Sequence, residues 1–252
     1  MIKNIIFDLD GTISKSAPGI LNAFEYALDK MGKTYSRNDL YKYIGPPLRD
    51  SFVKELGEDL ADKGVEIYRE YYFTKGLFET EIYDGIKDLM ENLNSKGYKI
   101  FLATSKGEES SEKILDYFGI LDYFSYVSGS ENNKNTKKKV IDHLLKGNNL
   151  KSSESIMIGD RSYDIEAANN LEIKTIAVTY GYGNKEEFEK ASFIANSPYE
   201  VINIIEKLKW ESWTVAKWLI YIFATAFFYD LSKTFSYYCN YWNIADYFLI
   251  LL

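Results

Sequence analysis

The chain has 252 residues, 46% hydrophobic and 27% charged, which allows one large domain or a domain with a smaller insert. Its net charge of −7 argues against non-specific binding to nucleic acid, which needs a basic surface. One cysteine and one histidine exclude an intramolecular disulfide, a cysteine-based zinc site and a histidine-rich metal site. The N-terminus shows no signal-peptide pattern, so we expect residues 1–208 to be cytoplasmic.

Short apolar runs alternate with helical patterns along most of the chain. Strands are predicted at 3–9, 99–105, 154–160 and 174–181, and more weakly at 126–129 and 192–196. Helices are predicted at 85–97, 110–119, 137–147 and 163–172, and Gly97, Gly119 and Gly147 lie where helix ends favour a left-handed residue. This alternation predicts an α/β fold with a Rossmann-like parallel sheet and helices on both faces.

Residues 15–79 interrupt this alternation. Their pattern is helical throughout, with Pro46 and Pro47 between two of the helices, and no strand pattern is visible. A helical insert of this size after the first strand predicts a separate all-helical cap. We therefore expect a core made of residues 1–14 and 80–208, with the cap at 15–79.

Residues 209–252 differ in composition from the rest of the chain. They contain all four tryptophans, the lone cysteine and a crowd of other aromatic residues, as in 218–231. The longest apolar run is about a dozen residues, whereas a membrane span needs roughly 20. Three interpretations stay open: a membrane-associated anchor, an aromatic extension that packs on the domain or on a partner, and a tail without a selected role.

Two carboxylates stand at the end of the first predicted strand. Asp8 and Asp10 are separated by one residue, so their side chains share a face of the strand. One of them is suited to attack phosphorus as a nucleophile. The other is suited to protonate the leaving oxygen and later to deprotonate water. Gly11 directly after them allows the backbone to turn tightly beside a ligand, so it is a candidate phosphate-binding residue.

Further polar residues follow the other predicted strands. Thr104 ends the second strand, Lys137 opens the helix after the third, and Asp160 and Asp164 follow the fourth. Ligands of open parallel sheets bind beyond the carboxyl ends of the strands, so these groups should converge. Carboxylate oxygens suit Mg²⁺, and the hydroxyl and the ammonium suit the phosphoryl oxygens. Phosphoryl transfer depends mostly on positioning and charge neutralisation, which this set supplies.

The sequences DLDGT at 8–12 and GDRSYD at 159–164, with Thr104 and Lys137 between them, resemble the four motifs of the haloacid dehalogenase-like hydrolase superfamily. The resemblance covers about residues 1–208. The helical insert looks like the C1-type cap of phosphoglycolate phosphatases and 5′-nucleotidases, and the second aspartate of the first motif favours phosphatase over dehalogenase chemistry.

The resemblance implies a role for each matching residue. Asp8 is then the nucleophile and Asp10 the general acid/base. Mg²⁺ is held by Asp8, Asp160 and the backbone carbonyl of Asp10. Thr104 and Lys137 bind phosphate, with Lys138 as an alternative to Lys137, and Asp164 supports the metal site or the lysine.

Two further positions are candidates for contact with the substrate. Arg49, in the cap segment 44–52, offers a planar cation for a carboxylate or a second phosphate on the substrate. Ser105 and Lys106 follow Thr104 and lie where the phosphate or the leaving group would be bound.

The sequence thus predicts a Mg²⁺-dependent phosphatase for a small phosphate monoester, phosphoglycolate or a nucleoside 5′-monophosphate, with an aspartyl-phosphate intermediate. The alternatives are a sugar-phosphate phosphomutase and a membrane-tethered or partner-binding protein that retains the fold. No nucleic-acid partner is expected, and membrane contact through residues 210–252 stays open.

Overall fold

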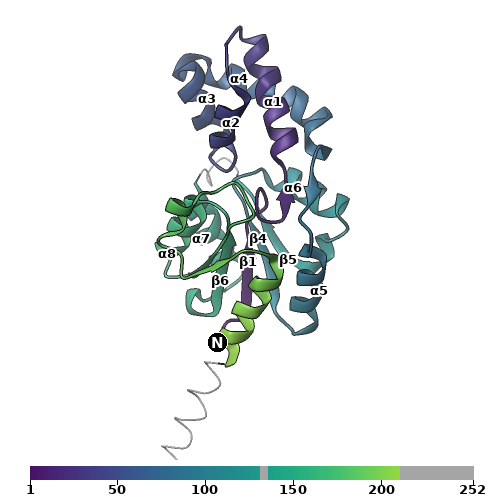
Figure 1. Ribbon diagram of the computed structural model, residues 1–252, viewed down its shortest axis with the longest axis vertical. Helices are drawn as coiled ribbons and strands as arrows, with labels where there is room; N and C mark the ends of the chain where they lie inside the picture. Colours follow the sequence, from purple (N-terminus) through teal and green to yellow (C-terminus); the bar gives the residue numbers. More distant parts are fainter. Residues whose placement is uncertain (131–135, 211–252) are drawn as a thin grey trace, which may run out of the picture. The chain divides into compact units, whose positions relative to one another are not determined.

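The computed structural model describes residues 1–130 and 136–210 (Figure 1). Residues 1–206 form one compact unit, which contains both the sheet and the helical insert. Within the described residues, six parallel strands form a sheet in the order β5-β4-β1-β6-β7-β8. The strands are β1 (Asn4–Phe7), β4 (Lys99–Ala103), β5 (Phe124–Ser128), β6 (Ser155–Gly159), β7 (Lys174–Val178) and β8 (Phe193–Ala195). The predicted α/β parallel-sheet fold is confirmed.

The central strand β1 is buried along its whole length. It pairs with β4 on one side and β6 on the other, so that Ile5 lies level with Ile100 and Ile156. Parallel strands covered on both faces are apolar in successive positions rather than in alternate ones, as Ile5, Ile6 and Phe7 are. This explains why the strand was readable as a continuous apolar run.

The helices that connect the strands cover both faces of the sheet (Figure 1). They are α5 (Ile86–Ser95), α6 (Glu108–Tyr117), α7 (Lys137–Gly147) and α8 (Ser162–Asn169). The connection β4-α6-β5 runs toward one edge of the sheet, whereas β6-α8-β7 runs toward the other. Because such crossovers are right-handed, helices on oppositely directed connections lie on opposite faces. Val140, Ile141 and Leu144 of α7 form one core cluster with Phe101 and Met157 of the sheet.

The insert predicted as a cap consists mainly of helices. These are α1 (Ala17–Lys30), α2 (Arg37–Leu40), α3 (Leu48–Leu56) and α4 (Glu58–Thr74), with short 3-10 turns at Tyr41–Tyr43 and Gly76–Phe78. Phe24 of α1, Phe52 of α3 and Tyr68 of α4 pack with ring centroids 5.0 to 6.1 Å apart. Residues 15–79 are called the cap below. Their own aromatic core makes them a folded layer rather than a loop.

A small two-stranded antiparallel sheet joins the cap to the rest of the chain. Its strands are β2 (Ser14–Lys15) and β3 (Glu81–Ile82). The sequence pattern showed no strand here, because two residues are too few to produce a periodic signal. The remaining 3-10 turns, in the sheet layer, are at Leu121–Tyr123, Ser152–Glu154 and Lys185–Phe188.

Two of the three predicted helix-ending glycines adopt a left-handed conformation. Gly97 has φ +78° and Gly119 has φ +68°. Gly147 does not, because it is the last residue of α7, and Asn149 two positions later takes the positive φ of 52°. Asparagine tolerates this conformation better than most residues with a side chain. The predicted end of α7 was therefore right, but the residue that turns the chain was not.

Residues 211–252, nearly all of the predicted tail, lie outside the described residues. Within residues 1–130 and 136–210, no helix has both the length and the hydropathy needed to cross a membrane.

Candidate active site

Three neighbouring strands end in buried polar side chains at the same edge of the sheet. Asp8 and Asp10 follow β1, Thr104 follows β4, and Asp160 follows β6. The order of the strands changes direction at β1, which is where ligands bind in open α/β sheets. The topology therefore brings together residues that lie up to 152 positions apart in the sequence, from Asp8 to Asp160.

Lys137 lies at the centre of this group. Its Nζ is 2.5 Å from Oδ1 of Asp8 and 2.7 Å from Oδ1 of Asp164, and it donates to the backbone carbonyl of Ala103 at 2.9 Å. Lys137 is the first residue of α7, where Thr136 caps the helix by accepting from the backbone N–H of Lys139. Lys138, the alternative candidate, is exposed. The structure thus places Lys137, and not Lys138, beside Asp8.

The buried carboxylates of Asp8, Asp160 and Asp164 are called the acidic cluster below. They outnumber the one lysine that pairs with them, Lys137. Burial raises the pKa of Asp8 to about 7, although Lys137 opposes the shift, and the charges of Asp164 and Asp10 add to it. Burial also raises the pKa of Asp160, helped by the charges of Asp164 and Asp8. Buried carboxylates with raised pKa values are stabilised in the charged form by an additional cation. The cluster is therefore electrostatically suited to bind one.

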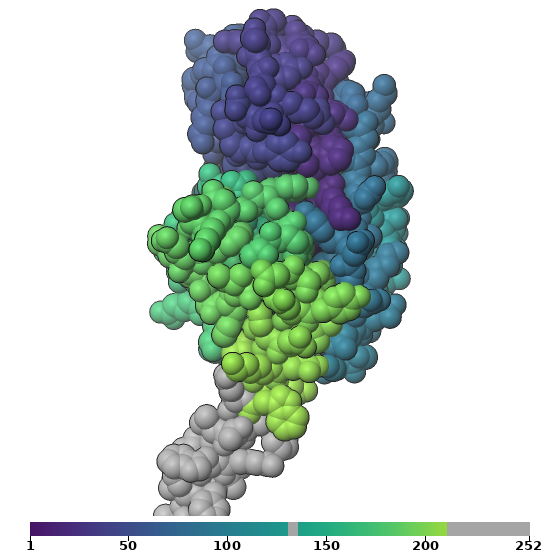
Figure 2. Space-filling view, viewed as in Figure 1, coloured from purple at the N-terminus to yellow at the C-terminus, as the bar shows by residue number. Residues whose placement is uncertain are grey.

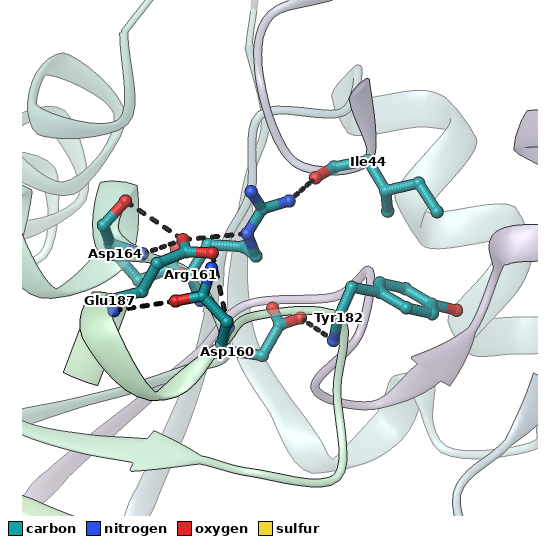
Figure 3. A network of polar contacts seen from close by, with 8 residues as sticks. Ile44, Asp160, Arg161, Asp164, Tyr182 and Glu187 are labelled. Carbon is teal, nitrogen blue, oxygen red and sulfur yellow. Dashed lines mark hydrogen bonds and ion pairs between the residues drawn. The ribbon is translucent and has the colours of Figure 1, made fainter. Parts of the chain in front are cut away.

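The donor atoms of the cluster fit a hard divalent ion. One oxygen each of Asp8, Asp160 and Asp164 lies within 4.8 Å of the others. Oδ1 of Asp160 is buried and has no hydrogen-bond partner among the described residues. Its Oδ2 accepts from the backbone N–H of Tyr182 at 2.7 Å (Figure 3). An all-oxygen set with a free buried oxygen matches the preference of Mg²⁺. The carboxylate of Asp10 is not part of this group.

Gly11 makes room for the carboxylate of Asp160. Its φ is +87°, and a Cβ atom at this position would lie 2.1 Å from Oδ2 of Asp160. Both the backbone conformation and the space therefore require glycine. Gly11 thus lies against Asp160, and its role in binding phosphate stays a prediction.

Asp10 pairs with a second lysine. Its Oδ2 is 3.2 Å from Nζ of Lys106, and Lys106 also donates to the hydroxyl of Tyr72 in α4 at 2.6 Å. Burial disfavours the charge on Lys106, but Asp10 and Tyr72 outweigh burial and raise its pKa above the ordinary value. Oδ1 of Asp10 is buried without a hydrogen-bond partner in the described part of the chain.

The predicted phosphate-binding residues that follow strand β4 lie close to Asp10 and Lys106. Thr104 is buried, and its Oγ1 accepts from the backbone N–H of Lys106 at 3.3 Å. Ser105 is half-buried and lines the same cavity as Asp10 and Lys106. The loop after β4 therefore presents a hydroxyl-bearing side chain and a lysine to the site.

A cavity of about 400 Å³ lies between this edge of the sheet and the cap. Asp10, Ser105 and Lys106 line it from the sheet, and residues 45–50 and α4 line it from the cap. Arg49 also lines the cavity, but its guanidinium is 2.8 Å from both Glu58 and Asp62. Arg69 of α4 also lines the cavity and was not singled out in the sequence. The cavity is large enough for a small ester whose reacting end lies at Asp10.

Two residues that the sequence analysis missed connect the cap to the acidic cluster (Figure 3). Arg161, directly after Asp160, donates to the backbone carbonyl of Ile44 in the cap and pairs with Glu187 at 3.0 Å. The hydroxyl of Tyr182 accepts from the backbone N–H of Ala17, the first residue of α1, at 2.8 Å. Figure 2 shows the cap, in purple and blue, against the green loops that follow β6 and β7. In the sequence, the position of Arg161 within GDRSYD was the only feature that could have indicated its role, and nothing indicated the role of Tyr182.

The model of the haloacid dehalogenase-like hydrolase family matches residues 5–178. The chain belongs to this family. The matched region includes Asp8, Asp160 and Asp164 as well as Lys106 and Lys137. The predicted resemblance is confirmed.

The relatives carry different names. The chain is 34% identical over 192 residues to tyrosine-protein kinase PtkA of Mycobacterium tuberculosis, covering 75% of this chain but only 66% of PtkA. It is 35% identical to a 5′-nucleotidase of Pseudomonas aeruginosa, covering 73% of this chain and 86% of the relative. It is 31% identical to a phosphoglycolate phosphatase of Vibrio parahaemolyticus, covering 81% and 96%.

A solved structure agrees with the assignment of the chain to this family. A predicted phosphatase from Clostridium acetobutylicum superposes with a TM-score of 0.78 at 37% identity, covering 82% of this chain and all of that one. The 5′-nucleotidase, the phosphoglycolate phosphatase and this solved structure carry the names of enzymes that act on phosphate esters, whereas PtkA is named a kinase.

Proposed function

We propose that this protein is a Mg²⁺-dependent phosphatase that hydrolyses a small phosphate monoester through an aspartyl-phosphate on Asp8. The observation that carries the proposal is the geometry around Lys137, which holds Asp8 at 2.5 Å among acidic oxygens suited to a divalent ion. In this proposal residues 15–79 serve as the cap of a core formed by 1–14 and 80–208.

One set of residues would hold the metal ion, and another would bind the phosphoryl oxygens. Asp8, Asp160 and the backbone carbonyl of Asp10 would hold Mg²⁺, with Asp164 beside them. When bound, the ion would neutralise charge on the phosphoryl oxygens. Lys137 and Thr104 would bind the same oxygens from the protein side, and Lys137 would also keep Asp8 ionised and aimed at phosphorus.

The reaction takes two steps. In the first, an oxygen of Asp8 attacks phosphorus, the bond from phosphorus to the ester oxygen breaks, and Asp10 gives its proton to that oxygen. In the second, Asp10 takes a proton from water while the water oxygen attacks phosphorus, and the bond from phosphorus to the oxygen of Asp8 breaks. Inorganic phosphate leaves, and Asp8 is regenerated as a carboxylate.

The cavity limits the substrate to a small ester. The relatives named phosphoglycolate phosphatase and 5′-nucleotidase support a carboxylate-bearing or nucleoside ester. Two cap arginines line the cavity, and of these Arg49 is already paired with Glu58 and Asp62. A substrate with a second anionic group would be met by Arg69, or by Arg49 after exchange of its partners.

Phosphate release tests the proposal. Purified protein is assayed with phosphoglycolate, nucleoside 5′-monophosphates and sugar phosphates, with Mg²⁺ or with chelator. We expect release that depends on Mg²⁺ and falls by on the order of 10⁴-fold or more in Asp8→Asn. Asp84→Asn, at a fully exposed position, is the matched control and should keep full activity.

The same assay separates the alternatives. A phosphomutase would convert a sugar phosphate to its isomer without net release of phosphate. A folded protein that neither releases nor transfers phosphate from any ester of the panel would contradict the enzymatic proposal.

A further inference from the structure

We propose that Lys106 is a positioning residue that orients the carboxylate of Asp10, and that Tyr72 of the cap holds Lys106 in place. The inference rests on the proposed function, since it concerns the general acid/base of that reaction. The observation behind it is that the ammonium group of Lys106 has two partners. It lies 3.2 Å from Oδ2 of Asp10 and 2.6 Å from the hydroxyl of Tyr72.

The two oxygens of Asp10 have different surroundings. Oδ2 is paired with Lys106, whereas Oδ1 is buried and has no hydrogen-bond partner in the described residues. The side chains of Asp10 and Lys106 are only 10% and 9% exposed, and both residues line the cavity. A charge-assisted contact to one oxygen favours one orientation of the carboxylate. Lys106 therefore leaves Oδ1 as the oxygen that exchanges a proton with the substrate and with water.

The position of Lys106 depends on both layers of the molecule. From the sheet, its backbone N–H donates to Oγ1 of Thr104 at 3.3 Å. From the cap, the ring of Tyr72 lies 4.5 Å from its Nζ and stacks on Tyr68 with an interplanar angle of 17°. The hydroxyl of Tyr72 is thus presented by a rigid aromatic pair. Lys106 is fully held only while the cap lies against the sheet, so the acid/base is oriented only in that arrangement.

This arrangement has a kinetic consequence. Protonation by Asp10 matters most for esters whose leaving alcohol has a high pKa, since a good leaving group departs as an anion without help. Loss of orientation by about 1 Å costs on the order of 10² in rate where the proton transfer is needed. Variants of Lys106 or Tyr72 should therefore harm alkyl phosphates far more than p-nitrophenyl phosphate.

The test is the dependence of kcat/KM on the pKa of the leaving group. The parameter covers the steps up to departure of the alcohol, and the probes are a series of phenyl and alkyl phosphates with Mg²⁺. We expect a steeper dependence in Lys106→Met and Tyr72→Phe, with a loss of about 10- to 100-fold for alkyl esters in Lys106→Met. Lys113→Met, at an exposed lysine of α6, is the matched control and should leave the dependence unchanged.

A double variant shows whether Lys106 acts through Asp10. In an Asp10→Asn background, Lys106→Met should cost less than about threefold, because residues that act as one unit are not additive. A full additional loss would mean that Lys106 contacts the substrate by itself, and it would overturn the inference.

Tyr72→Phe keeps the ring and removes only the hydroxyl, so it carries the test even if Lys106→Met fails to fold. An active wild-type protein whose dependence is the same in Tyr72→Phe would refute the inference alone. A wild-type protein that hydrolyses none of the esters would refute the proposed function as well.

Discussion

At the scale of single residues, Lys137 is a buried charge that depends on several partners. It is a buried ammonium whose three partners, Asp8, Asp164 and the carbonyl of Ala103, come from three different segments. Removing one partner of a buried ion pair typically costs about 3–5 kcal/mol, because the other partner is left charged and unpaired. The charge cluster is thus expected to matter for stability as well as for the proposed chemistry.

Replacing Lys137 by Met should therefore lower both activity and stability. We expect loss of most phosphate release and a lower free energy of unfolding by about 3 kcal/mol or more, measured by urea denaturation. Lys138→Met, one residue further along α7 and exposed, should change neither. The reverse result, with Lys138→Met inactive, would show that the wrong lysine has been assigned.

Gly11→Ala tests the space beside the acidic cluster. The added Cβ would meet Oδ2 of Asp160 at 2.1 Å, on a backbone with positive φ. We expect Mg²⁺ to bind at least about tenfold more weakly, measured by titration of activity with the ion. Gly32→Ala has a similar φ of +65° but no atom within 4 Å, so it shows the cost of the backbone conformation alone. Equal effects of the two changes on Mg²⁺ binding would contradict this account.

What the sequence revealed of the site depends on the kind of contact. Asp8 and Asp160 could be located because each directly follows an apolar run at a strand end. Tyr182 could not, because it binds Asp160 through a backbone N–H, which carries no residue-specific signal. The partners of Arg49 were equally hidden, since Glu58 and Asp62 meet it only after α3 and α4 have packed.

At the scale of elements, length decided what was predictable. The strands of the parallel sheet and the helix α7 were recognisable because several successive positions are buried in a regular pattern. The two-residue strands β2 and β3 were missed, although they tie the start of the cap to its end. Pairing between distant short segments is set by tertiary contacts, and local sequence does not encode it.

The link between Arg161 and the loop before α3 should affect substrate binding. Arg161 donates to the carbonyl of Ile44, next to the loop that lines the cavity. A hydrogen bond to a charged group is worth about 1.5–3 kcal/mol, so Arg161→Met should raise KM by about tenfold or more. We expect a smaller change in kcat, because the acidic cluster is retained. Arg37→Met, an exposed cap arginine paired with Glu25, is the control, and a change confined to kcat would contradict the prediction.

At the scale of the whole molecule, we expect the buried acidic cluster to link stability to Mg²⁺ and to pH. Burial raises the pKa of Asp160, so the folded protein without the ion holds a proton there more tightly than the unfolded chain does. This contribution to stability is present at low pH and is lost as the pH rises from about 4 through the raised pKa. An ion at the same oxygen competes with that proton.

Mg²⁺ should therefore raise the melting temperature more at pH 7.5 than at pH 5.5. At 100 times the Kd the ion contributes about 2.7 kcal/mol, which corresponds to roughly 5–10 °C for a domain of this size. Differential scanning calorimetry with Mg²⁺ or with chelator measures the effect, and Asp160→Asn should remove it. A shift that is equal at both pH values would show that protonation of the cluster does not compete with the ion.

The contacts of Lys137 also bear on how the chain is made. Its partners lie near residues 8, 103 and 164, so synthesis must pass Asp164 before the ammonium can be fully satisfied. Until then, an emerging chain carries Asp8 and Lys137 without the strand that completes their surroundings. A nascent chain halted before β6 should consequently stay sensitive to protease along its first half, and protection should appear abruptly once β6 and α8 have left the ribosome.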